Sequence, residues 1–449
     1  MIDPSRRRGA CPGLTAPMQT GDGLLVRLTG SGSTIGLDAG AALCAAARRH
    51  GNGIIEVTAR GSIQIRGLTA ASAPAFADAV APLGIAAGDG IPILTDPLAG
   101  LAPAPATDAR RVAGALRQWL AAASFAALLG PKVSVVIDGG SALHLDDLRA
   151  DIRLGAGTGQ AGWQVGLGGD AASATTLGSV APTAAVEAAA RLVETLAQHG
   201  PQARARDVIR NRGSGAFTPA IAHLLTQAPG PAPRPRSEAI GIHPLRDGRL
   251  GLGIGLAFGH TDAAALDALI ERAGHAGASG LRTAPDRALI VVGLAADSAP
   301  ALAADAESLG FITRRADPRR YVVACAGAPI CAAAEIPARA LGPLISSAAA
   351  PILDGSSTIH VSGCPKGCAH PGACALTIVG GQGGCGLVVD GSARDQPSAT
   401  IAAAALPSGI ASIAQDVARA KRPGERSADT LARLGDAPLA AIFRAADHG

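Results

Sequence analysis

The sequence predicts an α/β (α+β) protein built from two copies of a pair of modules. Three observations predict this fold. Two segments with the same order of strand and helix patterns occur in the two halves of the chain, and each is followed by a longer stretch of glycine-closed strands. A proline-rich stretch separates the halves. The 449 residues are also too many for one typical core.

Composition limits the classes of function. Hydrophobic residues make up 48% of the chain and aromatic residues only 2%, so Ala, Leu, Val and Ile must build the core. The net charge of +4 gives no general argument for a nucleic-acid or membrane partner. We find no apolar leader and no run of about twenty apolar residues. We therefore expect a cytoplasmic protein whose eight cysteines bind metal or pack, because disulfides are rare there.

The N-terminal segment and first module cover residues 1–95. Residues 23–30 alternate between apolar and polar side chains, which predicts a strand. Apolar residues at helical spacing, followed by glycine, predict a helix within 34–53. A second pair of strands is expected in 54–68.

The same order of elements returns in residues 240–312. A strand is expected at 248–256, a helix at 261–277 with Thr261 as its N-cap, and a pair of strands at 280–294. Both runs end on Gly-Leu, which gives a period of roughly 226 residues, far too long for a solenoid. The repeat therefore indicates a duplicated domain pair.

A longer α/β stretch follows each of these modules, at residues 96–227 and 313–449. Each contains strand-like runs closed by glycines, which we place at 132–140, 163–170, 358–363 and 376–384. The proline-rich linker occupies residues 228–239 and has polyproline character.

The cysteines form two pairs. Five residues separate Cys325 from Cys331, and three separate Cys364 from Cys368. Four thiolates can hold an iron–sulfur cluster or a zinc ion, but five residues is a wide spacer for a zinc knuckle. Unrelated buried thiols are the third alternative, and Cys44, on the apolar face of the first predicted helix, fits that description.

A histidine and a carboxylate stand close together in the first half of the chain. His144 and Asp146 would lie on one face of a strand, and such a pair can contribute to a facial iron triad. A pair this short arises easily by chance. The sequence therefore assigns no ligands to a mononuclear iron.

The pattern C-x5-C followed by S-G-C-P-x-x-C is similar to the cluster signature of the siroheme sulfite and nitrite reductase superfamily. The resemblance implies duplicated ferredoxin-like modules, each followed by a nitrite/sulfite reductase-like 4Fe-4S domain module, with pseudo-twofold symmetry. It also implies that only the second copy holds a [4Fe-4S] cluster. Its ligands would be Cys325, Cys331, Cys364 and Cys368.

Within that superfamily, three stretches resemble the precorrin-3B synthase family of aerobic cobalamin biosynthesis. They are "RRGACPGLTAPMQTGDGLLVRLTG", "DPLAGLAP" and "GCPKGCAHPG". The chain also departs from the reductases. Lys366 stands where they usually have Asn, and Pro92 stands in place of an arginine that binds their small anionic substrates. Both departures disfavour a six-electron reductase.

The resemblance implies an oxidoreductase, a monooxygenase that converts precorrin-3A into the hydroxy-lactone precorrin-3B with O2 and NADH. The implied cofactors are the [4Fe-4S] cluster and a mononuclear non-haem iron. An electron donor is an implied partner, whereas nucleic acid and membrane are not. Two alternatives remain: a siroheme-dependent nitrite or sulfite reductase, and a non-enzymatic metal- or cluster-binding protein.

A precorrin carries many carboxylates, so its pocket needs fixed cations, and the planar fork of arginine suits them. The segment "TARGSIQ" resembles a family strand, and "LGPKVSV" resembles a family loop. We place the arginines on strands of the two modules, and lysine is scarce enough in this chain to be informative. The expected substrate-binding residues are Arg27, Arg60, Gln64, Arg66, Lys132, Arg287 and Lys366. The sequence identifies no catalytic residue.

Overall fold

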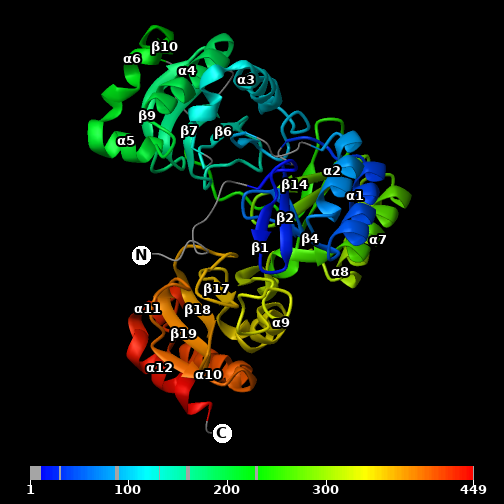
Figure 1. Cartoon of the computed structure of the whole chain (residues 1–449), viewed down its shortest axis with the longest axis vertical. Coiled ribbons are helices and arrows are strands. Elements are labelled where there is room, and N and C mark those ends of the chain that lie inside the picture. The colour runs from blue at the N-terminus through cyan, green and yellow to red at the C-terminus, as the bar shows by residue number, and fades with distance from the viewer. Residues whose placement is uncertain are drawn as a thin grey trace.

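The computed structural model describes residues 12–29, 32–85, 90–130, 132–157, 162–227 and 231–447. The predicted α/β class and duplicated plan are confirmed. Figure 1 shows the two longer modules at opposite ends of the molecule and the two ferredoxin-like modules beside each other between them. In the described part, no helix is long and apolar enough to cross a bilayer.

The two ferredoxin-like modules contain the predicted elements. The elements of the first are β1 (Met18–Thr20), β2 (Gly23–Thr29), α1 (Leu37–His50), β3 (Ile54–Val57), β4 (Ser62–Leu68) and α2 (Ser72–Val80). Those of the second are β11 (Gly241–Pro244), β12 (Leu250–Gly255), β13 (His260–Asp262), α7 (Ala263–His275), β14 (Gly280–Ala284), β15 (Ala288–Leu294) and α8 (Ser298–Ser308). Leu68 and Leu294, which end the sequence repeat, also end β4 and β15.

Each ferredoxin-like module contributes a segment to the sheet of the other. β13, which precedes α7, pairs antiparallel with β3 and extends the first sheet to the order β1-β2-β4-β3-β13. Ile35, which precedes α1, makes the matching antiparallel bridge to Leu281 of β14. α1 and α7 pack together in one apolar core that includes Leu43 and Leu269. The two modules therefore fold as one body with a pseudo-twofold axis.

The two longer modules also repeat each other. We call residues 93–227 the first reductase-like module, because residues 93–95 belong to its sheet, and residues 313–449 the cysteine module. The elements of the first are β5 (Ile93–Thr95), α3 (Ala109–Ala122), β6 (Val135–Asp138), β7 (Ala150–Ala156), β8 (Trp163–Gly169), β9 (Thr175–Val180), α4 (Ala185–Gln198), α5 (Ala205–Arg212), α6 (Thr218–Ile221) and β10 (Leu225–Thr226). Those of the second are β16 (Val322–Ala324), α9 (Ala338–Ala348), β17 (Ile359–Ser362), β18 (Cys374–Gly381), β19 (Gly384–Gly391), β20 (Ala399–Ile401), α10 (Leu406–Ala420), α11 (Ser427–Leu434) and α12 (Asp436–Ala445).

In both sheets the first three strands are parallel and the later ones antiparallel. β5, β6 and β7 correspond to β16, β17 and β18. The central strands β6 and β17 are buried throughout, as is typical of strands covered on both faces. The carboxyl ends of parallel strands meet at one edge of the sheet, which is where such sheets bind ligands. The loops 96–108 and 139–149 meet there in one module, and the loops 325–337 and 363–373 in the other.

Three details differ from the sequence prediction. β5 belongs to the sheet of the first reductase-like module, so the boundary between the first two modules lies before β5 and not after residue 95. Thr261 lies in β13, and Asp262 is the N-cap residue of α7, without a side-chain cap bond. Residues 228–230 of the predicted linker lie outside the described residues, and residues 231–239 form no helix or strand.

Arg282 on β14 joins three segments of the chain. Its side chain is only 1% exposed. Nη1 donates hydrogen bonds to the carbonyl oxygens of Pro97 and Ala99 at 2.9 and 2.8 Å, and Nε donates to Thr34 Oγ1 at 2.8 Å. Burial lowers the pKa of Arg282 to about 10. Arg282 thus ties the ferredoxin-like body to the 96–108 loop.

The substitution Arg282→Met should lower the free energy of unfolding by about 2–4 kcal/mol, because each hydrogen bond from a charged donor contributes ~1.5–3 kcal/mol and the buried carbonyls lose their donors. Urea unfolding measures the change. Arg206→Met, at an arginine that is 63% exposed, should change stability by less than about 0.5 kcal/mol. Equal effects of the two substitutions would contradict the role of Arg282.

Candidate functional site

Two of the four paired cysteines lie at the edge of the cysteine module's sheet where the carboxyl ends of its parallel strands meet. Cys325 directly follows β16, and its N–H donates to the carbonyl oxygen of Val361 on β17 at 3.1 Å. Cys364 comes two residues after β17 ends. The N–H of Gly363 donates to Cys325 Sγ at 3.1 Å. Parallel pairing of β16 and β17 therefore brings the two cysteine loops together.

The first ferredoxin-like module covers Cys331. Its N–H donates to the carbonyl oxygen of Gly327 at 2.8 Å, which folds the 325–337 loop back on itself. The next residue, Ala332, donates its N–H to the carbonyl oxygen of Gly21, in the β1–β2 turn, at 3.0 Å. A Cβ atom at Gly21 would lie 2.4 Å from Cys331 Sγ, so only glycine fits there.

The environment of Cys325 suits a metal-bound thiolate better than a free one. Burial raises the pKa of its thiol to about 11; the N–H groups of Gly363 and Gly327 oppose that rise, and the neighbouring Cys368 and Cys364 add to it. Iron would supply the positive charge that a buried thiolate needs, and N–H donors aimed at sulfur are a regular feature of cluster sites. The residues present therefore fit an iron–sulfur cluster.

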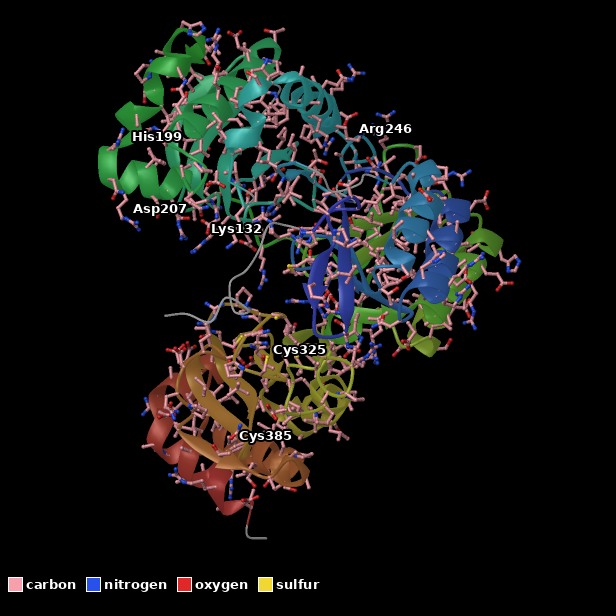
Figure 2. All side chains as sticks on the ribbon, in the orientation of Figure 1. Lys132, His199, Asp207, Arg246, Cys325 and Cys385 are labelled. Atoms are coloured by element: carbon pink, nitrogen blue, oxygen red, sulfur yellow. The ribbon has the colours of Figure 1, made fainter. Side chains whose placement is uncertain are left out.

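Figure 2 shows Cys325 on the side of the cysteine module that faces the ferredoxin-like body, whereas Cys385 lies within the module. Cys331 and Cys364 are half-buried and Cys368 is exposed. Cys44 is fully buried in the shared core, as the sequence predicted, and burial raises the pKa of its thiol to about 12.

Three of the predicted substrate-binding residues share one face of the first sheet. Arg27 is the cross-strand partner of Gln64, which in turn faces Glu56 on β3. With its amide oriented to satisfy both neighbours, Gln64 accepts from Arg27 Nη2 at 2.7 Å and donates to Glu56 Oε2 at 2.9 Å. Arg66 pairs with Asp22 at 2.7 Å and with Glu56 at 3.4 Å, and its side chain is 12% exposed. Protein carboxylates thus already neutralise Arg66.

Arg60 and Arg287 lie in turns and not on strands, contrary to the sequence prediction. Arg60 is in the β3–β4 turn, and Arg287, with a φ of 63°, is in the β14–β15 turn. Arg60 donates to the carbonyl oxygen of Arg149 at 2.7 Å and to Ser134 Oγ at 3.2 Å. Arg287 donates to the carbonyl oxygen of Ala369 at 3.4 Å. The two arginines thus reach corresponding loops, 139–149 and 363–373.

The two predicted lysines are exposed and lie on different modules. Lys132 comes two residues before Ser134, which Arg60 contacts. Figure 2 shows it at the edge of the first reductase-like module that faces the middle of the molecule. Lys366 lies between Cys364 and Cys368. The predicted residues therefore form two groups, one around the cysteine loops and the polar sheet face, the other at Arg60 and Lys132.

A histidine that was not predicted from the sequence lies beneath the cysteine loop. His360 on β17 is fully buried, and neither ring nitrogen has a hydrogen-bond partner among the described residues. A Cβ atom at Gly367 would lie 3.8 Å from its Cε1. Burial lowers the pKa of His360 to about 4, and His370 and Arg287 add to that effect, so the ring is neutral at pH 7. The one sequence feature that could have indicated His360 is that it is a polar residue within an apolar strand.

A cavity of about 500 Å³ lies between the second ferredoxin-like module and the 325–337 loop. Phe258, Ile330 and the Arg339–Asp262 ion pair line it together with His260, whose buried Nε2 has no partner among the described residues. Burial lowers the pKa of His260 to about 3. None of the predicted substrate-binding residues lines this cavity.

Comparisons with known proteins agree with this geometry. Residues 16–83 match the family model of the nitrite/sulfite reductase ferredoxin-like half domain. The chain is 41% identical over 442 residues to a precorrin-3B synthase from Sinorhizobium sp., covering 98% of this chain and 95% of that one. It is 27% identical over 182 residues to sulfite reductase [ferredoxin] 2 of Mycolicibacterium paratuberculosis, covering 38% of this chain and 33% of that protein.

A solved structure has the same fold. The Mycobacterium tuberculosis NirA protein superposes with a TM-score of 0.73, covering 93% of this chain and 84% of that chain at 19% identity. The near-complete match to the Sinorhizobium protein is decisive for the family. The chain belongs to the precorrin-3B synthase family, within the superfamily that includes the nitrite and sulfite reductases.

Proposed function

We propose that this protein converts precorrin-3A to precorrin-3B with O2 and NADH. The observation that carries the proposal is the 41% identity to a precorrin-3B synthase over nearly the full length of both chains. One oxygen atom enters the product as a hydroxyl on a meso carbon, and the other leaves as water. NADH supplies the two electrons, and a ring A acetate closes a γ-lactone. The reaction takes place in the cytoplasm, where thiols stay reduced.

In this proposal Cys325, Cys331, Cys364 and Cys368 hold one [4Fe-4S] cluster. When bound, the cluster supplies one-electron transfer between the donor and the active site. Gly363 donates its N–H to Cys325 Sγ and so stabilises the thiolate form of that ligand. Gly21 packs against Cys331 and excludes water from that side of the site.

The protein's main task toward its substrate is to hold carboxylates in fixed positions. Arg27 and Gln64 contribute polar groups from the first sheet. Arg287 and Lys366 contribute them from around the 363–373 loop. Arg60 and Lys132 lie at the first reductase-like module. Arg66, already paired with Asp22 and Glu56, positions this polar face and does not contact substrate. Carboxylates gripped at several points orient one carbon of the macrocycle for reaction.

The proposal also includes a mononuclear non-haem iron, which when bound supplies oxygen activation. Carboxylate and imidazole ligands suit such an ion. Among the described residues, Asp138, His144 and Asp146 can each offer a ligand atom to a single ion. These residues fit the ion chemically.

Replacing any one of Cys325, Cys331, Cys364 and Cys368 with serine should abolish or sharply reduce the iron and acid-labile sulfide content, because the cluster needs all four thiolates. Iron and sulfide assays of anaerobically purified protein measure this. Cys44→Ser, in the shared core, should leave both contents unchanged. Full cluster content in all four single variants would rule out this ligand set.

If Arg60 grips a substrate carboxylate, Arg60→Ala should weaken precorrin-3A binding by roughly 10- to 150-fold, which is the loss of about 1.5–3 kcal/mol. The dissociation constant is measured by fluorescence titration, with cluster content unchanged. Arg206→Ala, at an exposed position of the first reductase-like module, is the matched control. A dissociation constant that stays at the wild-type value would leave Arg60 with only its contacts to the 139–149 loop and Ser134.

Reaction under 18O2 should place one labelled oxygen in the product, and O2 uptake should require both precorrin-3A and a reductant. Mass spectrometry of the product and an oxygen electrode measure these two quantities. The purified protein should lack siroheme, since a tetrapyrrole is the substrate in this proposal. Stoichiometric siroheme together with turnover of sulfite or nitrite would establish the reductase alternative instead.

A further inference from the structure

The 139–149 loop of the first reductase-like module is the counterpart of the cysteine-bearing 363–373 loop. Both loops have the same length and connect corresponding parallel strands, β6 to β7 and β17 to β18. Counted from the end of the preceding strand, His144 holds the position that Cys368 holds in the other loop. The two loops therefore carry different types of ligand residue at corresponding backbone positions.

The preceding loops correspond in the same way. Asp96 directly follows β5, as Cys325 directly follows β16. The N–H of Gly139 donates to Asp96 Oδ2 at 3.1 Å, and the N–H of Gly363 donates to Cys325 Sγ at the same distance. The pseudo-symmetric position of the cluster site thus holds carboxylate and imidazole groups where the cysteine module holds thiols.

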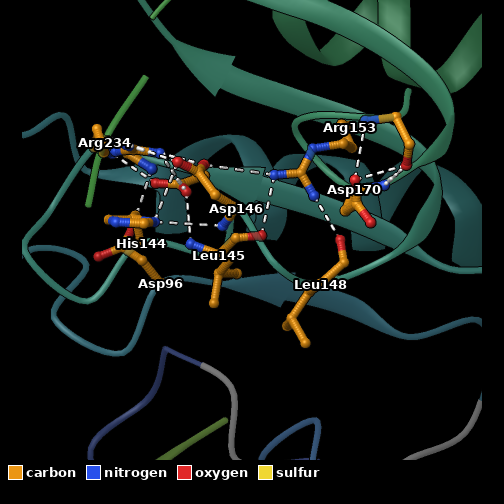
Figure 3. Close-up of polar contacts among 12 residues, drawn as sticks. Asp96, His144, Leu145, Asp146, Leu148, Arg153, Asp170 and Arg234 are labelled. Carbon is orange, nitrogen blue, oxygen red and sulfur yellow. Dashed lines mark hydrogen bonds and ion pairs between the residues drawn. The ribbon is translucent and has the colours of Figure 1, made fainter. Parts of the chain in front are cut away.

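We propose that Asp138, His144 and Asp146 bind a single divalent first-row cation. Each offers one ligand atom, and these atoms lie within 4.8 Å of one another. Asp138 and His144 are buried and the side chain of Asp146 is 20% exposed, so an ion has a route in past Asp146. Figure 3 shows His144 and Asp146 converging with Arg234. Oxygen and nitrogen donors without sulfur favour Mn²⁺ or Fe²⁺ at such a site over a cluster.

The orientation of His144 supports this assignment. Nε2 lies 2.8 Å from the carbonyl oxygen of Pro235, which can only accept, so Nε2 carries a hydrogen. Nδ1 lies 3.2 Å from Asp146 Oδ2. Nδ1 also accepts a hydrogen bond from the N–H of Asp146 at 3.4 Å. A cation placed between Nδ1 and the Asp146 carboxylate would bind both groups. A metal-bound histidine characteristically donates its second ring N–H to a carbonyl or carboxylate.

A buried carboxylate beside the three ligands is a second observation. Asp96 is 0% exposed, and its Oδ1 accepts no hydrogen bond of ordinary geometry from the described residues. The Asp138 charge lies close enough to act on it. Buried carboxylates need a nearby positive charge. Arg282 acts on Asp96 in this sense, and an ion at Asp138 would add to its effect.

Arg234 currently neutralises two of the three proposed ligands, Asp138 and Asp146. Its Nη2 lies 3.0 Å from Asp138 Oδ2 and 2.5 Å from Asp146 Oδ1, and its Nε lies 3.0 Å from Asp146 Oδ2. A divalent ion needs the same carboxylates, so the guanidinium and the ion compete. Arg234 belongs to the segment that joins the two halves of the chain. Ion binding therefore shifts Arg234, while Arg153, 3.8 Å from Asp146, remains as an outer partner.

The test is a Mn²⁺ titration of the full-length protein with its cluster intact, after anaerobic treatment with a chelator, followed by the EPR signal of free Mn²⁺. We expect one bound Mn²⁺ per chain. His144→Gln and Asp146→Asn should each weaken binding by more than about 100-fold, because even changes behind the ligands cost 10- to 100-fold. Arg234→Gln, which removes the competing guanidinium, should tighten binding.

His223→Gln and Asp207→Asn, at surface positions of the same module, are the matched controls and should bind as the wild type does. Circular dichroism and cluster absorbance check that each variant is folded. Wild-type binding no tighter than that of His144→Gln or Asp146→Asn would overturn the site. Binding that appears only in Arg234→Gln would also overturn it, because the guanidinium would then be the permanent cation.

A catalytic role for this ion rests on the proposed function, whereas binding of the ion to the protein does not. The titration contains no precorrin, NADH or O2, so failure of the proposed reaction would leave the Mn²⁺ result standing. Conversely, a protein that oxidises precorrin-3A without binding Mn²⁺ at His144 would retain the proposed function and lose this site.

Discussion

The architecture depends on the exchange of short segments between the two ferredoxin-like modules. β13 extends the sheet of the first module, and Ile35 bridges to the sheet of the second, so neither sheet edge is complete alone. Unpaired backbone groups at a buried edge are costly, which makes the exchange stabilising for both modules. The resulting body holds the β3–β4 and β14–β15 turns in equivalent positions. From these turns Arg60 and Arg287 contact the two longer modules.

Much of this fold follows from local patterns. Alternating residues predicted β2, because the period-two signal of a strand is contained in the strand itself. The cysteine loops were predictable because two thiol pairs in a chain with few other reactive groups stand out. Glycine-closed apolar runs located β6 and β17, although their boundaries were too wide.

The remaining features depend on contacts between distant segments. The sequence does not show that Arg66 pairs with Asp22 in the β1–β2 turn and with Glu56 on β3. Arg287 was assigned to a strand although Asp286 and Arg287 both adopt positive φ in a tight turn, which aspartate tolerates better than most residues. His144 and Asp146 lie in a loop and not on a strand, and their third companion, Asp138, comes from the end of β6. A local sequence pattern does not indicate that residues from separate segments lie close together in the fold.

If the four paired cysteines hold the proposed cluster, the contact between Gly21 and Cys331 limits when that cluster can be inserted. Gly21, which closes over this thiol, lies far upstream of Cys331 in the chain, whereas Cys364 and Cys368 lie downstream of it. Contacts between segments so far apart in sequence form late in folding. All four thiols are present only when most of the chain has been synthesised, and docking of the β1–β2 turn then covers one side. In the proposed holoprotein, the cluster would be inserted after synthesis of the cysteine module and before the β1–β2 turn docks.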